Sequence, residues 1–168
     1  MKITRKGFTL VELLIVMGIV GILGAMGLIA GQEATSAARA TVIADNLEKL
    51  ATAGMMFYEE NSEEIDKTGK IGNEAVTAEI LAGGINAYLK DDNNIAAVAT
   101  GDNTYFAAIN GEGTAMTWWV GYKFGTSDGN TQVQKALKNK KNRMHLRTAA
   151  TVTTDDYAGG DTVYMKIR

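Results

Sequence analysis

The sequence predicts an α+β protein in which one long N-terminal helix packs on a small antiparallel β-sheet head. Residues 8–30 form an apolar run with one charge, and an amphipathic helical pattern follows to about residue 60. From there on, short runs of strand-forming residues alternate with turn sequences. We therefore expect a helix over residues 8–60, with residues 8–30 spanning a membrane, and an α+β head over residues 61–168.

The composition excludes several kinds of site. The chain has 168 residues, no cysteine, no proline and a formal net charge of −2. Without cysteine there is neither a disulfide nor a thiolate metal site. The small net charge gives no indication of a nucleic-acid or membrane-surface partner. Without proline, any break in a helix must come from glycine, from packing or from the end of the chain.

The apolar run is long enough to cross a membrane. Lys2, Arg5 and Lys6 precede residues 8–30, which as a helix would span roughly 34 Å against a hydrocarbon core of about 30 Å. The basic residues predict a cytoplasmic N-terminus. A secretory signal fits poorly, because its apolar region is only about 7–15 residues long. A plain membrane anchor leaves Glu12 unexplained, since a charge inside a bilayer costs a few kcal/mol or more and indicates function.

The sequence around this carboxylate, KGFTLVELLIV at positions 6–16, resembles the leader junction of type IV prepilins and type II secretion pseudopilins. That family has a short basic leader ending in glycine. Phenylalanine, threonine and leucine follow, with a glutamate four residues after the phenylalanine. The resemblance covers roughly residues 1–29 and implies a pilin-like fold.

The resemblance also implies a processing route. A prepilin peptidase would remove residues 1–7 by cutting between Gly7 and Phe8, and would methylate the new amine of Phe8. The mature chain would wait in the inner membrane as a single-pass protein. It would then join other copies or related pilins in a helical extracellular or periplasmic filament. In that family the glutamate matching Glu12 is thought to meet the N-terminal amine of a neighbouring subunit.

Electrostatics independently supports a role for Glu12. A carboxylate in hydrocarbon favours its neutral form or a cationic partner. The amine that cleavage creates at Phe8 is the only cation the segment itself offers. It lies about one helical turn from Glu12, so pairing within one chain is possible. Pairing between axially offset chains is also possible and would set their register.

The second half of the long helix has one apolar face. Ile43, Leu47, Leu50, Gly54 and Phe57 recur at spacings of four and three, which is typical of a helix that packs on a globular head. The first half is punctuated by Gly18, Gly21, Gly24, Gly27 and Gly31. These glycines could allow close helix approach or weaken the helix. We expect local unwinding around residues 24–31.

The head pattern predicts a helix over residues 74–89 interrupted at Gly83-Gly84, strands over residues 95–100, 104–109 and 114–124, a short helix over 131–142, and a hairpin of 149–153 with 162–167. One face of the third strand carries Met116, Trp118, Val120, Tyr122 and Phe124 by strict alternation. Trp119 faces the other way, where it either packs within the head or meets a neighbour.

Two clusters in the head are candidate binding sites. Asp155, Asp156 and Asp161 lie in a glycine-containing loop that could bind Ca²⁺, although a solvated turn is the simpler interpretation. A basic run could hold an anionic surface or DNA, or simply face solvent: Lys135, Lys138, Lys140, Lys141, Arg143, His145 and Arg147. No aromatic residue interleaves it, so we predict no specific nucleic-acid partner. No motif indicates an enzyme, and no cofactor other than calcium is suggested.

Three functions remain open on the sequence. The first is a structural subunit of a type IV pilus-like filament, serving adhesion, motility or DNA uptake. The second is a pseudopilin of a type II secretion system or a minor pilin. The third is a monomeric membrane-anchored binding module. The first two require cleavage at Gly7, and the third predicts an unprocessed chain.

Overall fold

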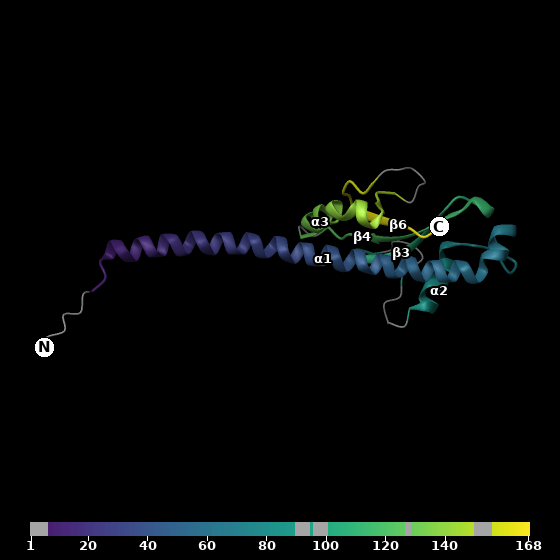
Figure 1. Cartoon of the computed structure of the whole chain (residues 1–168), viewed down its shortest axis with the longest axis horizontal. Coiled ribbons are helices and arrows are strands. Elements are labelled where there is room, and N and C mark those ends of the chain that lie inside the picture. Colours follow the sequence, from purple (N-terminus) through teal and green to yellow (C-terminus); the bar gives the residue numbers. More distant parts are fainter. Residues whose placement is uncertain (1–6, 90–94, 96–100, 127–128, 150–155) are drawn as a thin grey trace. The chain divides into compact units, whose positions relative to one another are not determined.

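The computed structural model describes residues 7–89, 95, 101–126, 129–149 and 156–168, and confirms the α+β class (Figure 1). The chain forms two compact units, Met1–Thr35 and Ser36–Arg168. The helices are α1 (Leu10–Thr68), α2 (Ala78–Tyr88) and α3 (Gly129–Met144), with a 3₁₀ turn at Gly113–Ala115. The strands are β1 (Lys70–Ile71), β2 (Glu74–Ala75), β3 (Thr104–Asn110), β4 (Thr117–Lys123), β5 (Leu146–Arg147) and β6 (Thr162–Lys166).

Helix α1 is continuous through its glycine-rich part. Residues 24–31 are helical, so the expected local unwinding is wrong for this structure. Each glycine costs only about 1 kcal/mol relative to alanine and keeps its backbone hydrogen bonds, so spaced single glycines need not break a helix. The hydroxyl of Thr35 also donates to the carbonyl oxygen of Gly31 at 2.8 Å, within the helix.

Helix α1 ends at Thr68, beyond the predicted end near residue 60. The expected breakers are held in the helix because they bond to the preceding turn. Asn61 Nδ2 donates to the Phe57 carbonyl at 2.9 Å, and Ser62 Oγ donates to the Glu59 carbonyl at 3.0 Å. The helix stops where Gly69 adopts a φ of 69° and its N–H donates to the Ile65 carbonyl at 2.8 Å.

A four-stranded antiparallel sheet forms the centre of the second unit, in the order β3-β4-β6-β5. The predicted buried face of β4 is confirmed, because Met116, Trp118, Val120, Tyr122 and Phe124 are all buried. Burial does not alternate along the strand, because residues 118–122 are all buried. This face packs on α1: the Trp118 ring stacks 6.0 Å from the Phe57 ring and meets the Tyr58 ring edge-on at 5.5 Å. Trp119, on the opposite face, is also buried.

The predicted stripe on α1 supplies the other side of this core. Ile43, Leu47, Leu50 and Gly54 are buried, and Phe57 is half-buried. Gly54 lies against the side chain of Ile167, and a Cβ there would lie 2.6 Å from Cδ1 of Ile167, so this side chain would have to shift. The sheet face and the α1 stripe therefore form one hydrophobic core.

The C-terminal hairpin differs from the prediction. Strand β6 forms as expected, but it pairs with β4 on one side and with β5, Leu146–Arg147, on the other. The segment expected to pair with it, residues 149–153, lies mostly outside the described residues. The strand expected over residues 95–100 also lies there except for Ile95, which is buried and hydrogen-bonded through its backbone to the side chain of Asn86.

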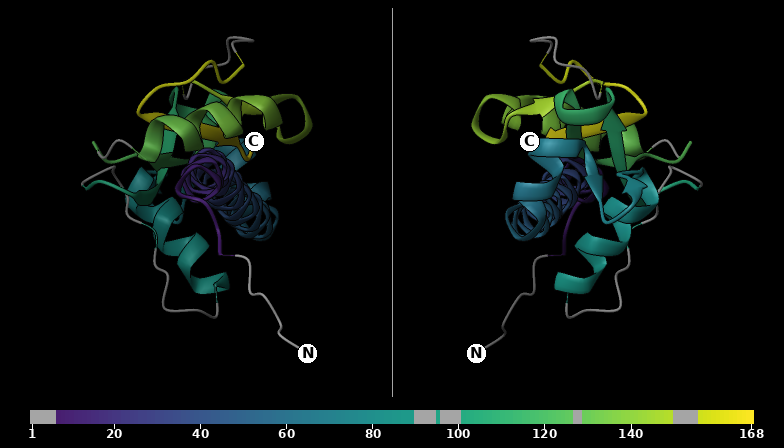
Figure 2. Two further views of the ribbon diagram at one scale, coloured as in Figure 1. Left: turned by 90° about the vertical axis from the view of Figure 1, so that its left-hand side faces the viewer. Right: turned by 90° about the vertical axis from the view of Figure 1, so that its right-hand side faces the viewer.

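Helix α3 covers the helix predicted at residues 131–142 and is longer at both ends. Helix α2 is shorter than predicted, because residues 74–75 form β2 and the helix begins after Thr77, whose hydroxyl accepts from the Ile80 N–H. Within the second unit, α2 and α3 lie on different sides of α1 (Figures 1 and 2).

The expected interruption at Gly83-Gly84 is wrong, since both glycines are helical within α2. They differ in surroundings: a Cβ on Gly84 would lie 2.5 Å from the Phe57 ring, whereas a Cβ on Gly83 would meet nothing within 4 Å. We expect Gly84→Ala to destabilise the head by about 1–3 kcal/mol through overpacking. Gly83→Ala should stabilise it by about 0.5–1 kcal/mol through helix propensity.

Thermal unfolding of the two single variants beside the wild-type chain checks this prediction. The substitution is the same in both variants and the positions are adjacent, so the change in backbone entropy is matched. Equal shifts in Tm, whether up or down, would show that the α2–α1 contact is not as close as the structure has it.

Candidate processing and assembly site

The Gly7–Phe8 junction lies directly before α1, in three residues that are not helical. The Phe8 side chain is 86% exposed, and a Cβ on Gly7 would meet nothing within 4 Å. The peptide bond between them is thus uncovered within the described part of the chain. An exposed, non-helical segment of this kind is accessible to a peptidase. Residues 1–6 lie outside the described residues.

Thr9 and Glu12 form a reciprocal cap at the start of α1. The Thr9 backbone N–H donates to Glu12 Oε2 at 2.8 Å, and the Thr9 hydroxyl donates to the same oxygen at 2.9 Å. The Glu12 N–H lies 3.3 Å from Thr9 Oγ1, to which it donates. This is the capping-box arrangement of threonine with a glutamate three residues later. The cap also places the carboxylate at the positive end of the helix dipole.

Our sequence analysis missed the role of Thr9. The signal was present, because a threonine followed three positions later by a glutamate, just before an apolar run, predicts a helix start. The cap uses Oε2 of Glu12 and leaves Oε1 without a hydrogen bond among the described residues. The carboxylate can therefore accept a further donor while it still caps the helix.

The rest of the first unit exposes a continuous apolar surface. Its large side chains are each at least 52% exposed: Phe8, Leu10, Val11, Leu13, Leu14, Ile15, Val16, Met17, Ile19, Val20, Ile22, Leu23, Met26, Leu28 and Ile29. An 18-residue window of α1 near the N-terminus has a mean hydropathy of 2.6 and no buried residue. By length and composition α1 can cross a membrane. Exposed apolar surface of this extent indicates a membrane or protein contact.

The three aspartates of the proposed calcium loop are only partly described. Asp156 pairs with Arg147 at 2.9 Å, and the backbone carbonyl of Asp161 accepts from the Phe124 N–H at 2.7 Å. The hydroxyl of the buried Tyr157 donates to the Gly160 carbonyl at 2.9 Å, and burial raises the pKa of Tyr157. In the described part of the chain no three acidic, histidine or cysteine residues gather as metal ligands. Asp155 lies outside it, so the calcium site stays a prediction.

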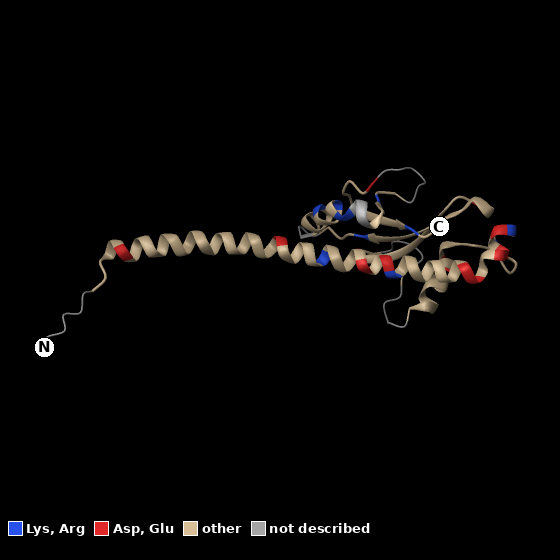
Figure 3. Cartoon of the chain, viewed as in Figure 1, with Lys and Arg blue, Asp and Glu red and all other residues tan. Residues whose placement is uncertain are grey.

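The basic run predicted from the sequence falls mainly on α3 (Figure 3). Lys135 and Lys138 are exposed, and Lys140 is partly exposed. His145 follows the helix, exposed and with a φ of 50°. Arg147 forms the ion pair with Asp156. Lys135 and Lys138 make no ion pair with a described residue and are exposed to a partner outside the chain.

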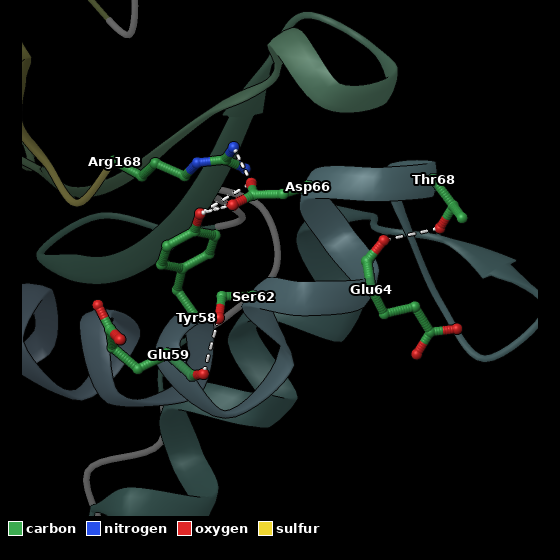
Figure 4. Close-up of polar contacts among 7 residues, drawn as sticks. All are labelled: Tyr58, Glu59, Ser62, Glu64, Asp66, Thr68 and Arg168. Carbon is green, nitrogen blue, oxygen red and sulfur yellow. Dashed lines mark hydrogen bonds and ion pairs between the residues drawn. The ribbon is translucent and has the colours of Figure 1, made fainter.

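A polar cluster that the sequence did not reveal joins the end of α1 to the last residue (Figure 4). Tyr58 donates to both carboxylate oxygens of Asp66 at 2.8 Å, and Arg168 donates to Asp66 Oδ1 at 2.5 Å. The guanidinium of Arg168 also lies 4.5 Å from the centre of the Tyr58 ring. Burial and the hydrogen bond to Asp66 raise the pKa of Tyr58. Because Asp66 and Arg168 are 102 residues apart, no local pattern could predict the contact.

Comparison with known proteins agrees with the N-terminal geometry. Residues 3–28 match the family described as the Prokaryotic N-terminal methylation motif. No curated protein and no solved structure gives a significant match to the chain. The matched segment contains the Gly7–Phe8 junction, the Thr9–Glu12 cap and most of the exposed apolar surface.

The chain therefore carries a prepilin-type N-terminal methylation motif on a pilin-like α+β architecture, which is consistent with the type IV pilin and pseudopilin family. The motif indicates a structural subunit rather than an enzyme. It implies processing by a prepilin peptidase and assembly with other pilins. Together with the apolar first half of α1, it fits anchoring in a membrane before assembly.

Proposed function

We propose that this chain is a structural subunit of a type IV pilus-like filament, cut between Gly7 and Phe8, methylated on the new Phe8 amine and assembled through α1. The match of residues 3–28 to the methylation motif carries the proposal. Residues 1–7 are the leader, and residues 8–30 lie first in the inner membrane. The filament then forms in the periplasm or outside the cell.

The geometry of the first unit supports this role. Its apolar side chains are exposed all round the helix, as suits a segment surrounded by lipid in one state and by other copies in the next. Glu12, the charged residue within the apolar run of residues 8–30, is bound by its own Thr9, which lowers the cost of keeping a carboxylate in an apolar environment. The free Oε1 can receive the amine of a neighbouring subunit.

Cleavage makes that pairing possible. In the uncut chain the nitrogen of Phe8 is a peptide amide and carries no charge. After cleavage it is an amine, which is cationic at neutral pH. We propose that Glu12 of one subunit pairs with this amine on the next, so that only processed chains find a partner for the carboxylate.

Intact-mass measurement of the native protein tests the proposal. We expect a mass that lacks residues 1–7 and carries one additional methyl group. An unprocessed chain would contradict the filament function and favour a monomeric membrane-anchored binding module. Electron microscopy of the producing cells then distinguishes a surface pilus from a secretion pseudopilus, since only the former gives long surface filaments under ordinary expression.

A further inference from the structure

The last turns of α1 form an acidic surface at one end of the second unit. Residues 59–66 contain five acidic residues and no basic one. Glu59 and Glu64 are exposed, and their carboxylates make no hydrogen bond or ion pair with any other described residue. In Figure 4 both carboxylates point away from the Tyr58–Asp66–Arg168 cluster. We call residues 59–64 the acidic turns.

The acidic turns continue from an exposed apolar patch. Met55 and Met56 are 54% and 53% exposed, and each lies one helical turn before a glutamate of the acidic turns. Large apolar side chains at this exposure, next to unpaired carboxylates, are typical of a contact surface with an apolar part and a charged rim. The described residues of the second unit do not cover this patch.

Helix α3 carries the opposite charge. It contains five basic residues and no acidic one, and its exposed Lys135 and Lys138 make no ion pair with a described residue. Figure 3 shows α3 and the acidic turns at opposite ends of the second unit. The head therefore has a positive end and a negative end along the direction of α1.

We propose that the exposed lysines of α3, Lys135 and Lys138, on one copy of this chain dock on the acidic turns of the next copy in the filament. The proposal rests on the proposed function and identifies a contact between heads, separate from the contact of the N-terminal helices. A positive end that meets a negative end is a head-to-tail contact. Such a contact does not close on itself between two copies, and it propagates as a helical filament.

Charge complementarity favours a second copy over nucleic acid as the partner of α3. Of the four glutamates of the acidic turns, Glu60 accepts from the Tyr88 hydroxyl and Glu63 pairs with Lys67. Glu59 and Glu64 remain unpaired among the described residues, and every neighbouring subunit presents them at high local concentration. No aromatic side chain on α3 could stack on bases. A duplex bound to α3 would also leave Glu59 and Glu64 without a partner. Binding of duplex DNA by α3 is therefore the competing outcome of the test.

A charge-swap experiment on the full chain, in cells that process it, tests the contact. The first variant, Lys135→Glu/Lys138→Glu, makes α3 less basic, and the second, Glu59→Lys/Glu64→Lys, cancels the negative charge of the acidic turns. We expect each variant to lower the yield of sheared filaments by about tenfold, because the substituted positions of one surface then meet unchanged side chains of like charge on the other. The combined variant, with all four substitutions, should restore most of the yield because the substituted side chains of the two surfaces again carry opposite charges.

Two single substitutions serve as matched controls. Lys166→Glu and Glu112→Lys reverse exposed charges of the same kinds outside both surfaces and should leave filament yield unchanged. Normal yield from both double variants, or no recovery in the combined variant, would overturn the proposal. So would normal filaments from Lys135→Glu/Lys138→Glu that lose binding to duplex DNA. If the processed wild-type chain itself forms no filament, the proposed function fails instead.

Discussion

Substitution of Glu12 by alanine should leave cleavage between Gly7 and Phe8 intact and reduce filament yield by about a hundredfold or more. Removal of one partner from a buried ion pair costs about 3–5 kcal/mol, because the other charge stays buried without compensation. In the filament that we propose, that charge would be the amine of the neighbouring subunit. Each tenfold change in an equilibrium constant corresponds to about 1.4 kcal/mol, so subunit addition is strongly disfavoured.

The Glu12→Ala experiment requires a control, because the substitution removes both a charge and the helix cap formed with Thr9. Glu12→Gln keeps a side chain that can cap but carries no charge. Thr9→Ala removes the cap but keeps the carboxylate. If the charge carries assembly, Glu12→Gln should resemble Glu12→Ala, and Thr9→Ala should reduce yield by a smaller factor, since the loss of a cap costs about 1 kcal/mol.

Intact mass of the membrane fraction and the yield of sheared filaments measure the two steps separately. Glu33→Ala is the matched control, since Glu33 is also an exposed glutamate of the first unit but lies beyond the apolar run. Normal filament yield from Glu12→Gln would show that the charge is dispensable. An unprocessed Glu12→Ala chain would place the role of the residue in recognition by the peptidase.

The elements whose sequence carries a repeating pattern could be predicted. The stripe from Ile43 to Phe57 has the period of a helix, and the run from Met116 to Phe124 has the period of a strand, so each identified its buried face correctly. The methylation motif was readable for a different reason, because its residues lie next to one another in the sequence, within positions 3–28.

The failures have two physical causes. Asn61 and Ser62 are turn formers, yet they lie in the helix, with their side chains bonded locally to carbonyls of the preceding turn. Gly83 and Gly84 are helical because each glycine weakens a helix by only about 1 kcal/mol, and at Gly84 only glycine leaves room for the Phe57 ring. The pairing of β6 with β5 and the contact of Arg168 with Asp66 join distant segments, and nothing local to either segment reports them.

Trp118 contacts both α1 and the C-terminal residues of the chain. Its replacement by alanine should have the largest effect on the stability of the head. The side chain is fully buried between the sheet and the rings of Phe57 and Tyr58. Its backbone N–H donates to the Arg168 carbonyl at 3.2 Å, and its carbonyl accepts from the Ile167 N–H at 2.8 Å. A cavity at this position should cost about 3–5 kcal/mol.

The expected fall in Tm is roughly 10–20 °C for a unit of this size. Differential scanning calorimetry of the full-length chain in detergent measures it, since calorimetry does not depend on the tryptophan signal. A fall of less than about 3 °C would mean that α1 and the sheet are not held together through this side chain. Filament yield should fall along with stability, because an unfolded head exposes the chain to proteolysis.

Comparison of Trp118→Phe with Trp119→Phe tests how the hydrogen bonding of each indole N–H affects stability. Trp118 Nε1 is buried and has no hydrogen-bond partner among the described residues, whereas Trp119 Nε1 donates to Thr117 Oγ1 at 3.0 Å. Both substitutions remove a similar volume from a buried position. Trp118→Phe also relieves an unpaired buried donor, while Trp119→Phe breaks a hydrogen bond worth about 1 kcal/mol. Trp118→Phe should therefore lower Tm less than Trp119→Phe, and the opposite order would indicate that Nε1 of Trp118 does have a partner.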